Sequence, residues 1–416
     1  MKPKSAETPS KHIQVSDLRA IARLATQGTL SVARIAEGVH QSVWRTMGMP
    51  GGAQKDQTRG LTGLIYQSIH GVTKAVGHTV DIALTKLQPL LESATAAPAD
   101  SPQRAAVVAA LNGVMGDRLA ADNNLLATPM TLRYNNTQLD WSAMPAMPQA
   151  TQKVLLLIHG LSMNDLQWTT QHAGQTVNHG STLAQALGYT PVYVRYNTGL
   201  HTSINGQALA AELEKLIANW PVPVTELTVL AHSMGGLVTR SAVHAATQAG
   251  LKWSAALKNI VFLGTPHHGS PLERAGNWVD VILGSTPYSA PFYRLAQLRS
   301  AGITDLRYGH VIDSDWRGHD RFRRKPDSRT PVPLPTAVAC FAVAATTAGK
   351  RSHLADRLVG DGLVPLHSAL GQHDDPEHCL AFAPEHQWIA YRMNHMELLG
   401  SPAVAQQVQT WLTPKS

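Results

Sequence analysis

The chain has 416 residues, of which 44% are hydrophobic, and this predicts a globular protein with room for one large α/β domain and an addition. Its two cysteines, Cys340 and Cys379, exclude a disulfide framework; we expect two reduced thiols, and a single bridge between them is the alternative. The net charge of +7 permits an anionic partner, but no nucleic-acid-binding module accompanies it, so nucleic acid is not expected. The N-terminus shows no secretory signal and no segment is long enough to span a bilayer, which favours a cytoplasmic protein.

The first third of the chain has helical periodicity. Apolar residues recur every three or four positions over 18–43 and again over 61–90, which predicts two long amphipathic helices. A linker rich in proline and alanine follows at 94–102, and 103–119 predicts a shorter third helix. We therefore expect a helical N-terminal extension over 1–127. Its apolar stripes must be covered by each other, by the rest of the protein, by a second subunit, or by a membrane or granule surface.

Short apolar segments dominate the remainder and predict the strands of a mostly parallel sheet. We expect strands near 130–134, 153–158, 191–196, 226–231, 259–264, 336–344 and 387–392, with a helix over 206–219.

About 65 residues separate two of these strands, far more than an ordinary connection needs. The segment from 270 to 335 therefore predicts a cap or lid insertion, with excursion helices packed on the sheet as the alternative. It contains a basic run at 316–329. We interpret that run as a solvated loop, or else as a contact for acidic head groups or a substrate carboxylate.

Ser233 lies where an apolar strand changes abruptly into small residues. Leu227–Leu230 is typical of a buried strand and the chain from Gly236 onward of a helix, so Ser233 occupies the tight turn between them. Such a nucleophile elbow strains the serine and requires small neighbours, which Ala231 and Gly235 provide. The pattern is A-x-S-x-G, with alanine where glycine is usual.

A second strand, 153–158, ends in His159-Gly160. A serine nucleophile needs two backbone N–H donors for the oxyanion that forms during acyl transfer. One comes from the residue after the serine, here Met234, and the other from a loop after an early strand, where Leu161 is the matching position. We expect His159 and Gly160 to lie against the substrate, with glycine permitting close approach.

The acid and the base should follow the serine in that order along the chain. Asp361 lies between two glycines after a strand, whereas its competitor Asp356 belongs to an ordinary polar stretch. His395 lies between the last strand and a terminal helix, which favours it as the general base. Rival histidines precede that strand: His373, His378 and His386.

Two adjacent histidines, His267 and His268, follow the strand near 259–264. We expect them to line the alcohol side of the substrate site. A metal site completed by Asp280 or His319 is the alternative, but the spacing matches no metal-binding signature.

Taken in order, five motifs make residues 128–416 resemble the α/β-hydrolase family, of the esterase/lipase kind. They are His159-Gly160, Ala231–Gly236, Gly264–Ser270, Gly360–Pro365 and Asn394–Leu399. The Gly-Thr-Pro-His-His-Gly segment is similar to one in lipases related to inositol deacylases. The resemblance implies a doubly wound, mostly parallel sheet with a helical cap. It also implies a Ser233–His395–Asp361 triad that needs no metal or organic cofactor.

The leading hypothesis is a serine carboxylesterase or lipase acting on a hydrophobic acyl ester. The alternatives are a polyester depolymerase or phospholipid deacylase that docks on a granule or membrane through the N-terminal helices, and a binding protein that keeps the hydrolase fold without its chemistry.

Overall fold

The computed structural model describes residues 102–144, 147–172, 174–270, 300–319, 327–349 and 360–414. The two N-terminal helices expected over 18–43 and 61–90 lie outside these ranges, as do Asp280, Asp356 and most of the predicted cap.

One eight-stranded sheet organises the described chain. Its order is β10-β9-β8-β7-β3-β6-β1-β2, and all pairs are parallel except β1 with β2 and with β6. The strands are β1 (Thr131–Tyr134), β2 (Thr137–Gln138), β3 (Lys153–Ile158), β6 (Thr190–Arg195), β7 (Glu226–His232), β8 (Leu257–Leu263), β9 (Ala339–Thr346) and β10 (Gln387–Tyr391). A separate hairpin joins β4 (Thr169–His172) to β5 (Gln175–Asn178).

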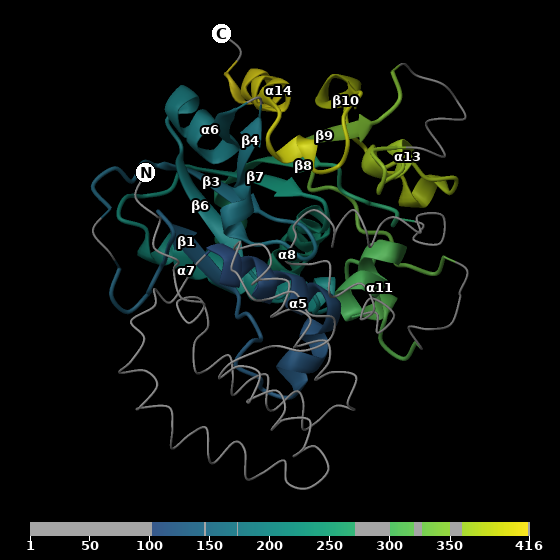
Figure 1. Ribbon diagram of the computed structural model, residues 1–416, viewed down its shortest axis with the longest axis horizontal. Helices are drawn as coiled ribbons and strands as arrows, with labels where there is room; N and C mark the ends of the chain where they lie inside the picture. The colour runs from purple at the N-terminus through teal and green to yellow at the C-terminus, as the bar shows by residue number, and fades with distance from the viewer. Residues whose placement is uncertain are drawn as a thin grey trace, which may run out of the picture.

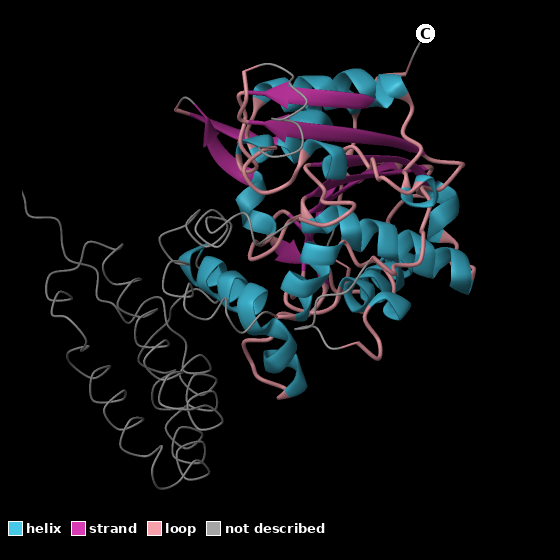
Figure 2. Cartoon of the chain, turned by 90° about the vertical axis from the view of Figure 1, so that its right-hand side faces the viewer, coloured by secondary structure: helices cyan, strands magenta, loops and turns pink. Residues whose placement is uncertain are grey.

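Helices cover both faces of the sheet, as Figures 1 and 2 show. α6 (His179–Leu187) and α14 (Pro402–Leu412) pack together on one face. α7 (Thr202–Asn219) and α8 (Met234–Ala249) pack together on the other, with α11 (Ala301–Tyr308) beyond them. Within the described ranges the remaining α-helices are α5 (Pro102–Ala121), α9 (Trp253–Ala256) and α13 (Leu366–Ala369). This doubly wound, mostly parallel arrangement is an α/β-hydrolase fold.

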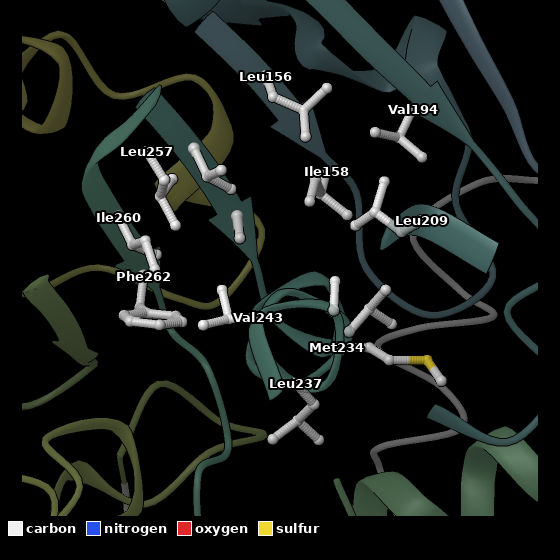
Figure 3. Close-up of a cluster of buried hydrophobic side chains, with 14 of the residues drawn as sticks. Leu156, Ile158, Val194, Leu209, Met234, Leu237, Val243, Leu257, Ile260 and Phe262 are labelled. Carbon is white, nitrogen blue, oxygen red and sulfur yellow. The ribbon is translucent and has the colours of Figure 1, made fainter. Parts of the chain in front are cut away.

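The core has two parts because β3, β7 and β8 are buried on both faces and alternate their side chains between them. On the α7/α8 side, Leu156 and Ile158 belong to one cluster with helix residues, and Ile158 lies beside Leu209 of α7 (Figure 3). On the α6/α14 side, Leu155 and Leu157 pack with side chains from those helices. Each fully buried aliphatic side chain contributes about 1.5–3 kcal/mol, so the sheet is a rigid support for the loops at its edge.

All seven predicted strands are present, with ends displaced by up to three residues. The short β2 and the β4–β5 hairpin were not predicted, because their residues are polar and largely exposed. α7 begins four residues before the predicted helix. Among the described helices, none is sufficiently long and apolar to cross a membrane.

α5, which the sequence analysis placed in the N-terminal extension, packs against the sheet domain. The Asn197 side chain donates a hydrogen bond to the Gly116 carbonyl at 2.9 Å, and the Ser300 hydroxyl donates one to the Gly113 carbonyl at 2.6 Å. A Cβ on Gly113 would lie 2.0 Å from Ser162 Oγ, so glycine is what permits this close approach. Within the described ranges, α5 therefore lies against the sheet domain.

Candidate active site

Ser233 occupies a strained turn between β7 and α8. Its φ of 55° and ψ of −123° lie in a region that non-glycine residues avoid, at a cost of about 1–3 kcal/mol. The Ser233 N–H donates to the Leu263 carbonyl at 2.8 Å, and the Gly236 N–H donates to the Ser233 carbonyl at 3.0 Å. These bonds on both sides hold the serine at the point where strand becomes helix.

Small residues are required around this turn because atoms of neighbouring segments lie against its backbone. A Cβ on Gly235 would lie 2.6 Å from the Ile158 carbonyl oxygen, at the end of the neighbouring β3. A Cβ on Gly236 would lie 2.0 Å from Thr265 Oγ1. Gly235 was expected from the sequence, whereas the need for Gly236 is visible only in the structure, where its neighbour Thr265 comes from the loop after β8.

His395 and Asp361 meet although 34 positions separate them. His395 Nδ1 lies 2.6 Å from Asp361 Oδ2, and both side chains are almost fully buried. The backbone N–H groups of Leu363 and Val364 donate to Asp361 Oδ1 at 2.9 and 2.8 Å, and the His395 N–H donates to the Asp361 carbonyl at 3.1 Å. With Nδ1 donating to the carboxylate, Nε2 is the nitrogen that can accept a proton.

Contacts from two sides place this imidazole beside the elbow. A Cβ on Gly264, which has a φ of +57°, would lie 3.1 Å from His395 Nδ1. From the other side, the ring centroid of His232 lies 4.7 Å from that of His395. His232 directly precedes Ser233, so the segment that carries the serine contacts the segment that carries the imidazole.

His232 is a residue that the sequence analysis missed. Its Nε2 lies 3.1 Å from the His395 carbonyl oxygen, so Nε2 carries the proton and donates. Burial, with the nearby His395 as a smaller contribution, holds the pKa of His232 well below its ordinary value, which keeps the ring neutral. The only signal in the sequence is a histidine at the end of an apolar strand, immediately before the serine.

The candidate oxyanion donors are the backbone N–H groups of Leu161 and Met234. Neither N–H donates to another group within the part of the chain that the structure describes. A Cβ on Gly160 would lie 3.0 Å from Ser233 Cβ, so the loop carrying Leu161 lies against the elbow. The Met234 side chain is buried in the core (Figure 3), which leaves its backbone for the site. Two N–H groups near one serine can stabilise a developing negative charge.

His159, expected to touch the substrate, is fully buried instead. Its ring stacks on Tyr196 with centroids 4.4 Å apart, and its Nδ1 lies 3.0 Å from the Gly160 carbonyl oxygen. Burial lowers the pKa of His159 to about 4, so the imidazole is neutral. The placement favours a role in supporting the Gly160 loop from behind.

The structure places His267 and His268 in different surroundings. His267 is fully buried between Phe262 and Phe382, and burial holds its pKa well below the ordinary value. The His268 ring faces His373, with centroids 4.9 Å apart. In the described ranges, no three His, Cys, Asp or Glu side chains are grouped so that they could hold a metal ion.

The rival histidines are used elsewhere. His386 packs on Phe341 with ring centroids 4.2 Å apart, and His373 Nε2 lies 3.2 Å from Asp327 Oδ2. His378 packs on His373. Both cysteines are free thiols: Cys340 is buried, which raises its pKa to about 12, and Cys379 is exposed.

A family model described as a domain of unknown function, DUF7379, matches residues 104–303. The match begins within α5. No curated protein matches the sequence.

Solved structures with a similar chain trace include lipase BlEst2 from Bacillus licheniformis. Its mature form has 18% identity and a TM-score of 0.40, with 68% of this chain and 97% of that chain covered. Its propeptide form has 16% identity and the same TM-score, with 70% of this chain but only 54% of that chain covered. Aspergillus fumigatus lipase B has 13% identity and a TM-score of 0.42, with coverages of 93% and 83%. Because these TM-scores are below 0.5, the fold assignment depends on strand order and on the elbow.

Proposed function

We propose that the protein is a serine carboxylic-ester hydrolase that acts on hydrophobic acyl esters. The observation that carries this proposal is the buried His395–Asp361 pair, with 2.6 Å between Nδ1 and Oδ2, packed beside a serine in strained elbow geometry. Strain at a buried, non-glycine residue persists only where the surrounding structure enforces it, and such positions concentrate at functional sites.

In the first half of the reaction, Ser233 Oγ attacks the ester carbonyl carbon while His395 Nε2 accepts the hydroxyl proton. Asp361 stabilises the resulting imidazolium, and the N–H groups of Leu161 and Met234 bind the oxyanion. The intermediate then collapses: the bond to the alcohol oxygen breaks, and His395 gives its proton to the leaving alcohol. An acyl group remains on Ser233.

The second half releases the acid. His395 removes a proton from water, the hydroxide adds to the acyl carbon, and the bond to Ser233 Oγ breaks as the serine regains its proton. Apart from the attacking water, the groups that act in each step are side chains and backbone N–H groups of this chain.

Hydrolysis of p-nitrophenyl esters of increasing acyl length tests the proposal. We expect Ser233→Ala to lower kcat by at least about 10³-fold, while Ser314→Ala, a change at an exposed serine, leaves it unaltered. Equal turnover by the native protein and Ser233→Ala would overturn the assignment, as would a native protein without activity on any ester of the series.

A further inference from the structure

The segment that carries Leu161 is a tight turn. The Met163 N–H donates to the Gly160 carbonyl at 3.3 Å, which closes a four-residue turn with Leu161 and Ser162 at its two central positions. Ser162 has a φ of 59°, in the left-handed region where a turn of this kind favours glycine at the second central position. The N–H at the first central position takes no part in closing the turn. The turn therefore leaves the Leu161 N–H for the substrate.

Ser162 can keep this conformation only if its surroundings hold it. Its N–H donates to Thr198 Oγ1 at 3.1 Å. It also lies against α5, because a Cβ on Gly113 would be 2.0 Å from Ser162 Oγ and 2.9 Å from Ser162 Cα. Ser162 is therefore held by the segment after β6 and by α5, a helix that lies outside the hydrolase domain predicted from the sequence.

α5 also holds the segment that carries Thr198. The Asn197 side chain donates to the Gly116 carbonyl at 2.9 Å and accepts from the Gly199 N–H at 3.0 Å. A Cβ on Gly199 would lie 2.1 Å from the Asn112 carbonyl oxygen, so the two backbones are in close contact. Both supports of the strained serine thus depend on the same helix.

The helix is kinked where it meets these segments. Met115 interrupts it with non-helical angles, a φ of −142° and a ψ of 22°, between Gly113 and Gly116. The two glycines on either side of the kink are the residues of α5 whose contacts with the turn and with Asn197 are described above. The packing of α5 beside α11 (Figure 1) places the same part of the helix next to the end of the predicted cap.

We propose that α5 is a positioning element for the oxyanion site, and that Gly113 acts through Ser162 on the N–H of Leu161. This inference rests on the proposed function, because it assigns a role in the same reaction. A displacement of α5 changes the direction of the Leu161 N–H and weakens the stabilisation of the oxyanion, whereas it leaves ground-state binding of the ester in place. The catalytic unit thereby extends to a helix that the sequence placed in the N-terminal extension.

Kinetics of Gly113→Ala on a p-nitrophenyl ester test the proposal. The new methyl group must displace Ser162 or α5, and we expect kcat to fall at least about tenfold with KM within about twofold of the native value. Gly206→Ala is the matched control, because its Cβ would lie 2.2 Å from Ser241 Oγ, a similarly tight contact made between α7 and α8. That variant should unfold at a lower urea concentration but keep kcat within about twofold of native.

Two further variants separate positioning from a loss of folding. Ser162→Gly removes the hydroxymethyl group that the new methyl would meet, and glycine accepts the positive φ. We therefore expect Ser162→Gly to restore most of the kcat that Gly113→Ala loses. Asn197→Ala removes the bond to α5 without adding atoms, which keeps the test valid if Gly113→Ala does not fold. We expect it to lower kcat at least about fivefold with a smaller effect on KM.

Hydrogen exchange followed by mass spectrometry adds a readout that needs no turnover. We expect faster exchange over residues 160–164 in Gly113→Ala than in the native protein, and no change there in Gly206→Ala. The inference is overturned if the native protein hydrolyses esters while Gly113→Ala and Asn197→Ala both keep its kcat, or if exchange over 160–164 is the same in Gly113→Ala and native. A native protein inactive on every ester, with faster exchange in Gly113→Ala, would instead overturn the proposed function and support the hold of α5 on the turn.

Discussion

His395 Nδ1 lies 2.6 Å from Asp361 Oδ2, and the carboxylate is fixed in turn by the N–H groups of Leu363 and Val364. Because the carboxylate selects the tautomer with a proton on Nδ1, Asp361→Asn should favour the tautomer that cannot accept the serine proton. We expect kcat for ester hydrolysis to fall about 10⁴-fold with KM little changed. Asp356→Asn, at the rival position, is the control. A larger loss in that control would transfer the acid role to Asp356.

His232 donates a hydrogen bond to the His395 carbonyl, which makes it a positioning residue for the imidazole. His232→Phe leaves that buried carbonyl without its donor, and we expect kcat to fall about tenfold or more, with a smaller effect on KM. His232→Gln offers an amide donor and should restore part of the loss. Separate kcat and KM values for both variants check this. An unaltered kcat in His232→Phe would show that the bond does not position His395.

Gly160 lies at the point where the loop that carries Leu161 passes closest to the serine elbow. A Cβ there would lie 3.0 Å from Ser233 Cβ and 3.1 Å from His232 Nδ1, so Gly160→Ala must displace the loop by a few tenths of an ångström. We expect a loss of kcat of about 10²-fold, because the oxyanion donors are sensitive to displacement. Gly349→Ala, whose nearest contact would be an ordinary 3.4 Å, is the control. Equal kcat values for the two variants would argue against the donor role of Leu161.

Three buried histidines should make the stability of the fold depend on pH. Burial lowers the pKa of His159 to about 4 and those of His232 and His267 well below their ordinary value. The unfolded chain gains these protons as pH falls below about 6.5, whereas the folded chain does not. The contribution of these histidines to the free energy of unfolding is therefore fully present above about pH 7, and it falls by up to about 1.4 kcal/mol per histidine for each pH unit between about 6.5 and 4.

Urea unfolding at several pH values between 7.5 and 4.5 measures this dependence. Within the described structure neither ring nitrogen of His267 has a hydrogen-bond partner, so His267→Phe removes a titrating group without breaking a bond. We expect a shallower decline of stability with pH in that variant. A decline as steep as in the native protein would show that His267 does not contribute.

The central strands could be predicted because β3, β7 and β8 are buried on both faces and appear in the sequence as short apolar runs, of which Val154–Ile158 is an example. The β4–β5 hairpin could not, since polar, exposed strands lack that pattern. The proximity of Asp361 and His395 follows from the topology, because the loops after parallel strands β9 and β10 meet at one sheet edge. The role of His232 depends on a contact between distant segments, which periodicity does not indicate.

Side-chain burial explains why His159 and His267 differ from their predicted positions beside the substrate. Nothing in the sequence shows that the His159 ring stacks inward on Tyr196 or that His267 lies among phenylalanine side chains. The sequence places 103–119 in the N-terminal extension because this segment is predicted to be helical like the two before it, whereas the packing of Gly113 and Gly116 on the sheet domain depends on shape.

The most direct measurement of the central claim is covalent labelling by a fluorophosphonate, with the modified residue identified by peptide mass spectrometry. The proposed site predicts one label per native molecule, on Ser233, which disappears in the heat-unfolded protein and is strongly slowed in His395→Ala. Labelling of a different serine, or labelling of Ser233 at the same rate in His395→Ala and in the native protein, would contradict the account.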